Sequence, residues 1–177
     1  MKELFGMVLV AFAACTVGSI DARAQDTKAI QLALFTPVQI YDETTSIKGF
    51  RLNLIYGVNE DVTGVDLGII NRTTGDVKGL QLGFVNMVAG NMKGIQLDFL
   101  NFIGGEAKAL QIGVYNAAET GTVVDVGLIN ITRSVKGFQL GLFNMTEDMH
   151  GLQIGLINII SNKEKLKIFP IVNWSFN

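Results

Sequence analysis

The residues of this chain whose chemistry could support catalysis are three carboxylates and one imidazole. Asp66, Asp98 and Asp125 are predicted to lie on the inner face of a β-sheet, where a pair of carboxylates could act as general acid and general base. The alternative, which we favour, is that they pair with Arg51 or with glutamine side chains and satisfy a polar interior. We therefore predict that the chain has no catalytic residue.

The imidazole belongs to His150, the only histidine of the chain. No second histidine can join it as a metal ligand, and Cys15 is the only cysteine. His150 occupies the position that lysine holds in other copies of an internal repeat, so we interpret it as a polar rim residue. The glycine-rich segment 88–94 lacks the Lys-Ser/Thr pair of a phosphate loop and is predicted to be a turn. The sequence thus predicts no metal and no cofactor.

The elements that position these residues are copies of one octapeptide, and residues 79–86 read GLQLGFVN. Close copies begin at Gly94, Ala109, Val123, Gly137 and Gly151, and looser copies begin at Ala29, Gly49 and Gly64. The third residues of successive copies are 20, 15, 15, 15, 15, 14, 14 and 14 positions apart. A period this regular is typical of a repeat architecture, so the residues that recur most often are expected to build the fold.

The composition is apolar for a chain with few helix signals. Hydrophobic residues make up 49% of the sequence and charged residues 17%, and the mean hydropathy is +0.37. The net charge of −2 provides no basic surface for nucleic acid. Beyond the N-terminal segment, no apolar run is long enough for a transmembrane helix. A closed β-barrel is the other way for such a chain to exist in a membrane.

The N-terminal segment has the features of an export signal. Met1 and Lys2 precede an apolar run over residues 4–14, and residues 22–24 form an A-x-A cleavage site. We predict a signal peptide over residues 1–24 and a single repeat β domain over residues 25–177. The alternative is a lipobox at residues 12–15, which would leave a lipid-anchored Cys15 as the mature N-terminus.

Two folds could use a repeat of this kind, because each copy alternates as a strand requires. In an antiparallel meander each copy is one strand followed by a hairpin turn, and the strands have about 10 to 11 residues, as outer-membrane strands do. In a β-solenoid each copy is one coil, and asparagine and glutamine side chains stack in ladders. The spacers contain charged residues, which suit hairpin tips better than a core wall: Glu106, Glu119, Arg133, Glu147 and Asp148. We therefore predict an all-β outer-membrane barrel of about ten strands, with the β-solenoid as the alternative.

The C-terminal segment gives a separate signal. Ile168, Pro170, Val172, Trp174 and Phe176 fall on one face of a predicted last strand. This strand resembles the C-terminal targeting strand of bacterial outer-membrane barrels, except that Asn177 follows the aromatic residue.

The octapeptides and this ending together resemble a bacterial family of exported surface-repeat proteins, found in spirochaetes and Bacteroidetes, with tandem GLQIGLxN-like units. The resemblance covers residues 29–176 and implies a location at the cell surface; the family has no established activity that could be transferred.

We expect a structural or interaction protein of the bacterial outer membrane or cell surface without enzymatic activity. The expected partners are outer-membrane lipid, the barrel-assembly machinery and an extracellular partner of unknown kind, with no nucleic acid. The alternative function, tied to the solenoid, is a secreted or lipid-anchored binding module that presents a flat face of glutamine and glycine. The third octapeptide residues and the neighbouring glycines would form that face.

Overall fold

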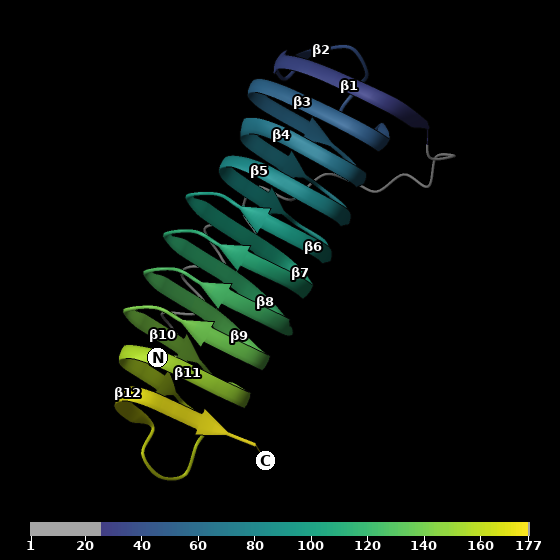
Figure 1. Ribbon diagram of the computed structural model, residues 1–177. Coiled ribbons are helices and arrows are strands. Elements are labelled where there is room, and N and C mark those ends of the chain that lie inside the picture. Colours follow the sequence, from purple (N-terminus) through teal and green to yellow (C-terminus); the bar gives the residue numbers. More distant parts are fainter. Residues whose placement is uncertain (1–25, 177) are drawn as a thin grey trace.

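The computed structural model describes residues 26–176, without the side chain of residue 122. The chain winds into an elongated stack of about nine coils, a β-solenoid, with β1 and β2 at one end and β12 at the other (Figure 1). The described residues contain strands and no helix, so none of them forms a helix that could cross a membrane. The predicted signal peptide, residues 1–24, and the alternative lipobox lie outside the described residues.

The stack is one continuous sheet of twelve strands. They are β1 (Thr27–Phe35), β2 (Val38–Gln39), β3 (Ser46–Asn59), β4 (Val62–Thr73), β5 (Val77–Val88), β6 (Met92–Leu97), β7 (Leu100–Ile112), β8 (Tyr115–Val126), β9 (Ile129–Leu140), β10 (Phe143–Thr146), β11 (Asp148–Ile160) and β12 (Ile168–Ser175). All pairings from β1 and β3 through β11 are parallel. The two antiparallel pairings, β1 with β2 and β11 with β12, lie at the ends of the stack.

Each octapeptide lies directly beside the same residues of the next octapeptide. Between β4 and β5, for example, Gly64 pairs with Gly79, Asp66 with Gln81, and Asn71 with Asn86. One repeat is therefore one coil. The all-β prediction is confirmed, the prediction of an antiparallel ten-stranded barrel is wrong, and the alternative of a β-solenoid is correct.

The barrel prediction failed because the octapeptide does not form one straight strand. In β5 it bends at Gly83, where an added Cβ would lie 2.1 Å from the carbonyl oxygen of Gly68 in the preceding coil. Residues 77–82 pair with β6 and residues 85–88 pair with β7, so they form a first and a second wall of the coil with a corner at residues 83–84. The octapeptide supplies both walls, so the charged residues between octapeptides do not need to form a wall. They form the remaining edge of the coil, which we call the polar edge and which includes Glu106, Glu119, Arg133, Glu147 and Asp148.

A second glycine brings adjacent coils close together. Gly79, the first residue of its octapeptide, has a φ of +145°, a conformation that residues with a side chain rarely adopt. A Cβ at this position would lie 1.9 Å from the carbonyl oxygen of Gly64. The recurrence of glycine at the start of the octapeptide thus follows from contact between backbones.

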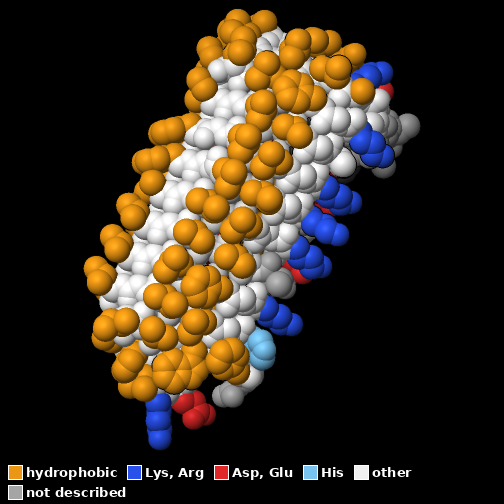
Figure 2. Space-filling model, in the orientation of Figure 1, with side chains coloured by type: hydrophobic (Ala, Val, Ile, Leu, Met, Phe, Trp, Pro, Cys, Tyr) orange, Lys and Arg blue, Asp and Glu red, His pale blue; other side chains and the backbone are white. Residues whose placement is uncertain are grey.

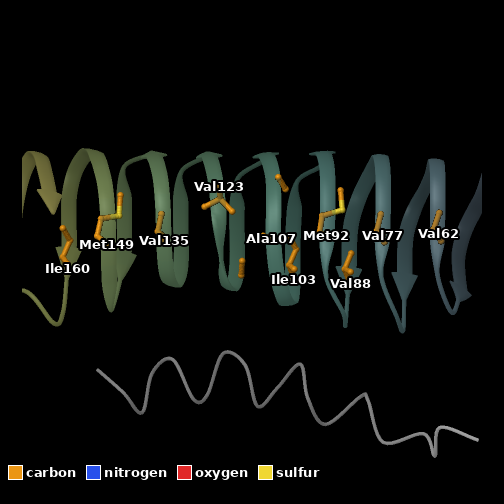
Figure 3. Close-up of a cluster of buried hydrophobic side chains, with 12 residues drawn as sticks. Val62, Val77, Val88, Met92, Ile103, Ala107, Val123, Val135, Met149 and Ile160 are labelled. Carbon is orange, nitrogen blue, oxygen red and sulfur yellow. The ribbon is translucent and has the colours of Figure 1, made fainter. Parts of the chain in front are cut away.

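The interior contains apolar side chains near the polar edge and polar side chains near the corner. One apolar file runs along the stack at the start of the first wall: Val62, Val77, Met92, Ala107, Val135 and Met149 (Figure 3). A second file faces it from the end of the second wall: Val88, Ile103, Ala118 and Ile160. This apolar half gains stability from burial, while the polar half must satisfy its groups by hydrogen bonding.

Candidate interaction surface

The carboxylate of Asp66 is buried inside the stack and bound by Arg51. The Nε and Nη2 atoms of Arg51 donate to Oδ1 and Oδ2 of Asp66 at 2.7 and 2.6 Å. Gln81 donates to Oδ2 from the next coil at 2.8 Å. Both charged side chains are at most 1% exposed. The predicted pairing of Asp66 with arginine and glutamine is confirmed.

Asp98 and Asp125 are buried without a cationic partner among the described residues. Burial raises the pKa of Asp98 to about 7, and the negative charge of Asp66 adds to the rise. Asp98 accepts a hydrogen bond from Asn86. Burial also raises the pKa of Asp125 to about 6, although hydrogen bonds from Gln139 and Thr132 oppose the rise.

The position of these carboxylates does not suit catalysis on a substrate. The exposed fractions of Asp66 and Asp125 are 0%, and that of Asp98 is 7%. A general acid or base must come within hydrogen-bond distance of a reacting group, and these side chains are covered by their own coils. They belong to the interior hydrogen-bond ladders of the solenoid.

The third residues of the nine octapeptides form the first ladder, and all of them are 0% exposed. Within it, glutamine amides donate toward the N-terminal end of the stack: Gln153 to Gln139 at 2.9 Å, Gln139 to Asp125 at 3.1 Å, Gln111 to Gln96 at 3.2 Å, Gln96 to Gln81 at 2.7 Å and Gln81 to Asp66 at 2.8 Å. The predicted flat glutamine and glycine face is therefore not a surface. Its glutamines point inward, where adjacent coils satisfy their amides.

The eighth residues form a second ladder with the opposite direction. Its amides donate toward the C-terminal end at 2.8 Å in each of these steps: Asn71 to Asn86, Asn101 to Asn116, Asn116 to Asn130, Asn130 to Asn144 and Asn144 to Asn158. The step from Asn86 to Asn101 is interrupted, because Asn86 donates to Asp98 instead. Asp98 stands where most other copies have the corner glycine.

The interruptions leave acceptor atoms without donors. Among the described residues, Oδ1 of Asn101, Oε1 of Gln111 and Oδ1 of Asp125 are buried and have no hydrogen-bond partner. Gln111 lacks a donor because its register neighbour, Asp125, has none when ionised. A proton on Asp125 would supply that donor, which agrees with the direction of its pKa shift.

The outside of the solenoid is apolar on three of its four sides. Residues two, four, six and seven of the octapeptide are apolar in all nine copies. The sixth residues follow one another along the corner, and we call them the apolar ridge: Leu34, Leu54, Ile69, Phe84, Phe99, Val114, Leu128, Leu142 and Leu156. Ridge side chains are as much as 66% exposed, at Leu156, and the rings of Phe84 and Phe99 stack at 4.9 Å. Figure 2 shows apolar side chains in rows along the length of the molecule.

Apolar rows on both walls flank the ridge. On the first wall, Ile95, Leu97 and Ile112 are 38 to 41% exposed. On the second wall, Ile129 and Ile157 are 37 and 47% exposed. Alternation along the first wall turns the second and fourth residues outward, and the corner turns both the sixth and the seventh residues outward.

Lysine is the residue before the octapeptide in six of the nine copies, beside the polar edge, and Thr63, Thr122 and His150 precede the other three. We call the exposed lysines among these residues the lysine row: Lys48, Lys78, Lys93, Lys108 and Lys136. Adjacent members lie in register, as Lys78 does with Lys93 and Lys93 with Lys108, and they follow one edge of the molecule (Figure 2). His150 continues the row beside Lys136, and its ring contacts Phe176 edge-on. Among the described residues no cluster of histidine, cysteine or acidic side chains could hold a metal.

Comparison with known proteins found no family model that matches this chain, and no match among curated proteins or solved structures. The resemblance to exported surface-repeat proteins therefore stays a prediction. The sequence reasoning missed the apolar ridge, although its signal was present: the sixth residue is never polar in any copy.

Proposed function

We propose that this chain is a structural and interaction protein of the bacterial cell envelope, without enzymatic activity, which acts through the apolar outside of its solenoid. One observation carries the proposal. In all nine octapeptides the inward third residue is polar and the outward second, fourth, sixth and seventh residues are apolar. This distribution is the reverse of that expected for a protein surrounded by water.

The size of the apolar exterior supports a binding role. About nine coils at about 4.8 Å each give a length of about 40 Å. Four residues separate the second from the sixth octapeptide residue, or about 13 Å at about 3.3 Å per residue. The first wall and ridge thus present about 500 Å², and the second wall adds to this. Continuous apolar patches of this size mark sites that contact other molecules.

The burial of the acidic side chains supports the part of the proposal that assigns no enzymatic activity. Asp66, Asp98 and Asp125, the carboxylates with catalytic potential, participate in ladders that hold the coils together. The barrel-assembly machinery, expected as a partner on the basis of a barrel fold, is not carried into the proposal. Export by the predicted signal peptide would deliver the chain to the envelope, where apolar partners are available.

Fractionation of cells that express the full chain tests this function. We expect the protein to remain with the envelope after a carbonate and urea wash and to be extracted by mild detergent. Phe84→Glu with Leu142→Glu places two charges on the ridge and should release folded protein into the soluble fraction. The matched control, Thr44→Glu with Thr74→Glu, adds the same charge at exposed polar positions and should leave the protein with the envelope. Wild-type protein in the soluble fraction as a monomer would contradict the proposal.

A further inference from the structure

The partner of the apolar exterior must cover more than one side of the molecule. A protein that docks on one wall would leave the other wall and the ridge exposed to water. A medium that surrounds the ridge and rises along both walls covers all three sides together. Lipid acyl chains are such a medium, and burial of apolar area in them is favourable for the same reason as burial in a protein core.

The backbone of the coils is compatible with lipid. Inside a bilayer each N–H and C=O group needs a partner within the protein. Coils between the two ends pair on both sides, as β5 does with β4 on one side and with β6 and β7 on the other. The walls therefore present apolar side chains over strands that pair with both neighbouring coils, and the unpaired strand edges lie at the two ends of the stack.

The distance between the lysine row and the ridge matches one leaflet. Six residues separate Lys78 from Phe84 along the first wall and the corner, which is at most about 20 Å at about 3.3 Å per residue. A bilayer with its headgroups is about 40 to 45 Å thick, so one leaflet is about 20 to 22 Å. With the ridge near the midplane, the lysine row lies at the depth of the phosphates.

The charges of the lysine row are complementary to those phosphates. Lys78 and Lys93 lie in register on adjacent coils, so their ammonium groups repel each other. Neither has an ion pair among the described residues, whereas Lys108 contacts Glu106 at 3.2 Å. The acidic side chain of Asp76 on the polar edge accepts a hydrogen bond from the backbone N–H of Asn91 instead. Anionic headgroups would relieve the repulsion within the row.

We propose that the solenoid lies along the surface of a bilayer with anionic phospholipids, with its ridge and walls in one leaflet and its lysine row among the phosphates. The polar edge then faces the water. This inference rests on the proposed function and names the partner of the same surface. The bilayer, rather than a membrane protein, is the occupant that matches the three apolar sides, the leaflet depth and the lysine row.

Binding to vesicles tests the charge complementarity. The full chain in a Cys15→Ser background is diluted from detergent onto vesicles of phosphatidylethanolamine with phosphatidylglycerol, or of phosphatidylcholine alone. We expect tighter binding to the anionic vesicles at low salt. Lys78→Glu with Lys93→Glu should weaken that binding at least tenfold. Lys165→Glu with Lys167→Glu makes the same change of charge in the loop before β12 and should weaken it less than twofold.

Depth measurement tests the orientation. Single cysteines at Phe84→Cys or Thr74→Cys in the same background carry a fluorescent label, and circular dichroism checks that each variant keeps its β structure. We expect nitroxides deep in the acyl chains to quench the label at position 84. Aqueous iodide should quench the label at position 74. Deep quenching at position 74, or none at position 84, would overturn the inference.

The two proposals fail in different ways. Protein that stays with the cell envelope through its ridge but binds neither type of vesicle overturns the lipid inference and leaves the proposed function standing, with a membrane protein as the partner. Protein that binds neither vesicles nor the envelope overturns both.

Discussion

Replacing the buried ion pair by the glutamines of the other coils is the sharpest test of the interior ladder. Six of the nine octapeptides have glutamine as their third residue, whereas β3 and β4 have Arg51 and Asp66. We expect the double substitution Arg51→Gln with Asp66→Gln to extend the glutamine ladder through this part of the stack. Each single substitution should instead leave one buried charge without its partner.

The magnitude follows from the contacts of the pair. Arg51 donates twice to Asp66, and also to the carbonyl of Arg72 at 2.9 Å and to the hydroxyl of Thr73 at 3.2 Å. Breaking a buried ion pair from one side costs about 3 to 5 kcal/mol. Additive losses would destabilise the double variant by about 6 to 10 kcal/mol, whereas we expect it within about 2 kcal/mol of the natural chain.

Urea unfolding, followed by far-ultraviolet circular dichroism in a mild detergent near neutral pH, measures these free energies. Urea is uncharged and does not screen the pair. Both single variants should unfold at lower urea concentrations than the double variant. A double variant less stable than either single variant would refute the idea that the pair substitutes for two members of the glutamine ladder.

Two further predictions concern contacts between coils. Gly79→Ala should lower the free energy of unfolding by about 3 kcal/mol, because the new methyl group meets the carbonyl of Gly64 and the backbone φ is unfavourable for alanine. The control is Ala109→Gly, at the same register position, which should lower the free energy of unfolding in urea by about 1 kcal/mol or less. Asp125 has its pKa raised from 3.8 to about 6, so the stability that it contributes is fully present below pH 3.8 and is lost as the pH rises through about 6. Asp125→Asn, whose amide can donate to Gln111, should show a smaller fall of the urea midpoint between about pH 4 and about pH 7. An unchanged fall would contradict the assignment.

The period and alternation of the octapeptide were sufficient to predict an all-β repeat protein. The pairing of Asp66 with Arg51 and Gln81 and of Asp125 with Gln139 agrees with the predicted partners, whereas Asp98 accepts from Asn86, which was not predicted. The parallel direction of the strands was not predicted. In the solenoid the sixth and seventh residues both lie outside and the third and eighth both lie inside, so the alternation changes phase at the corner. A straight strand would keep one phase throughout, as the barrel prediction assumed. The close approach of Gly83 to the carbonyl of Gly68 in the preceding coil is a contact between repeats.

The candidate surface was missed for a related reason. In a barrel, the residues around Phe84 would face lipid along a straight strand, and the glutamines would line the interior opposite them. In the solenoid the corner turns the sixth residue to an outer edge, while the third residue remains inside.

The opposite directions of the two amide ladders have an electrical consequence. Amide groups that donate in one direction along a row add their dipoles, as peptide groups do along a helix. Here the asparagine row points toward one end of the stack and the glutamine row toward the other, as in the steps from Asn130 to Asn144 and from Gln153 to Gln139. Their fields offset each other, so lengthening the solenoid by another coil does not build up a potential between its ends. Duplication of a repeat would therefore carry no electrostatic penalty from these rows, even where the surroundings have a low dielectric constant.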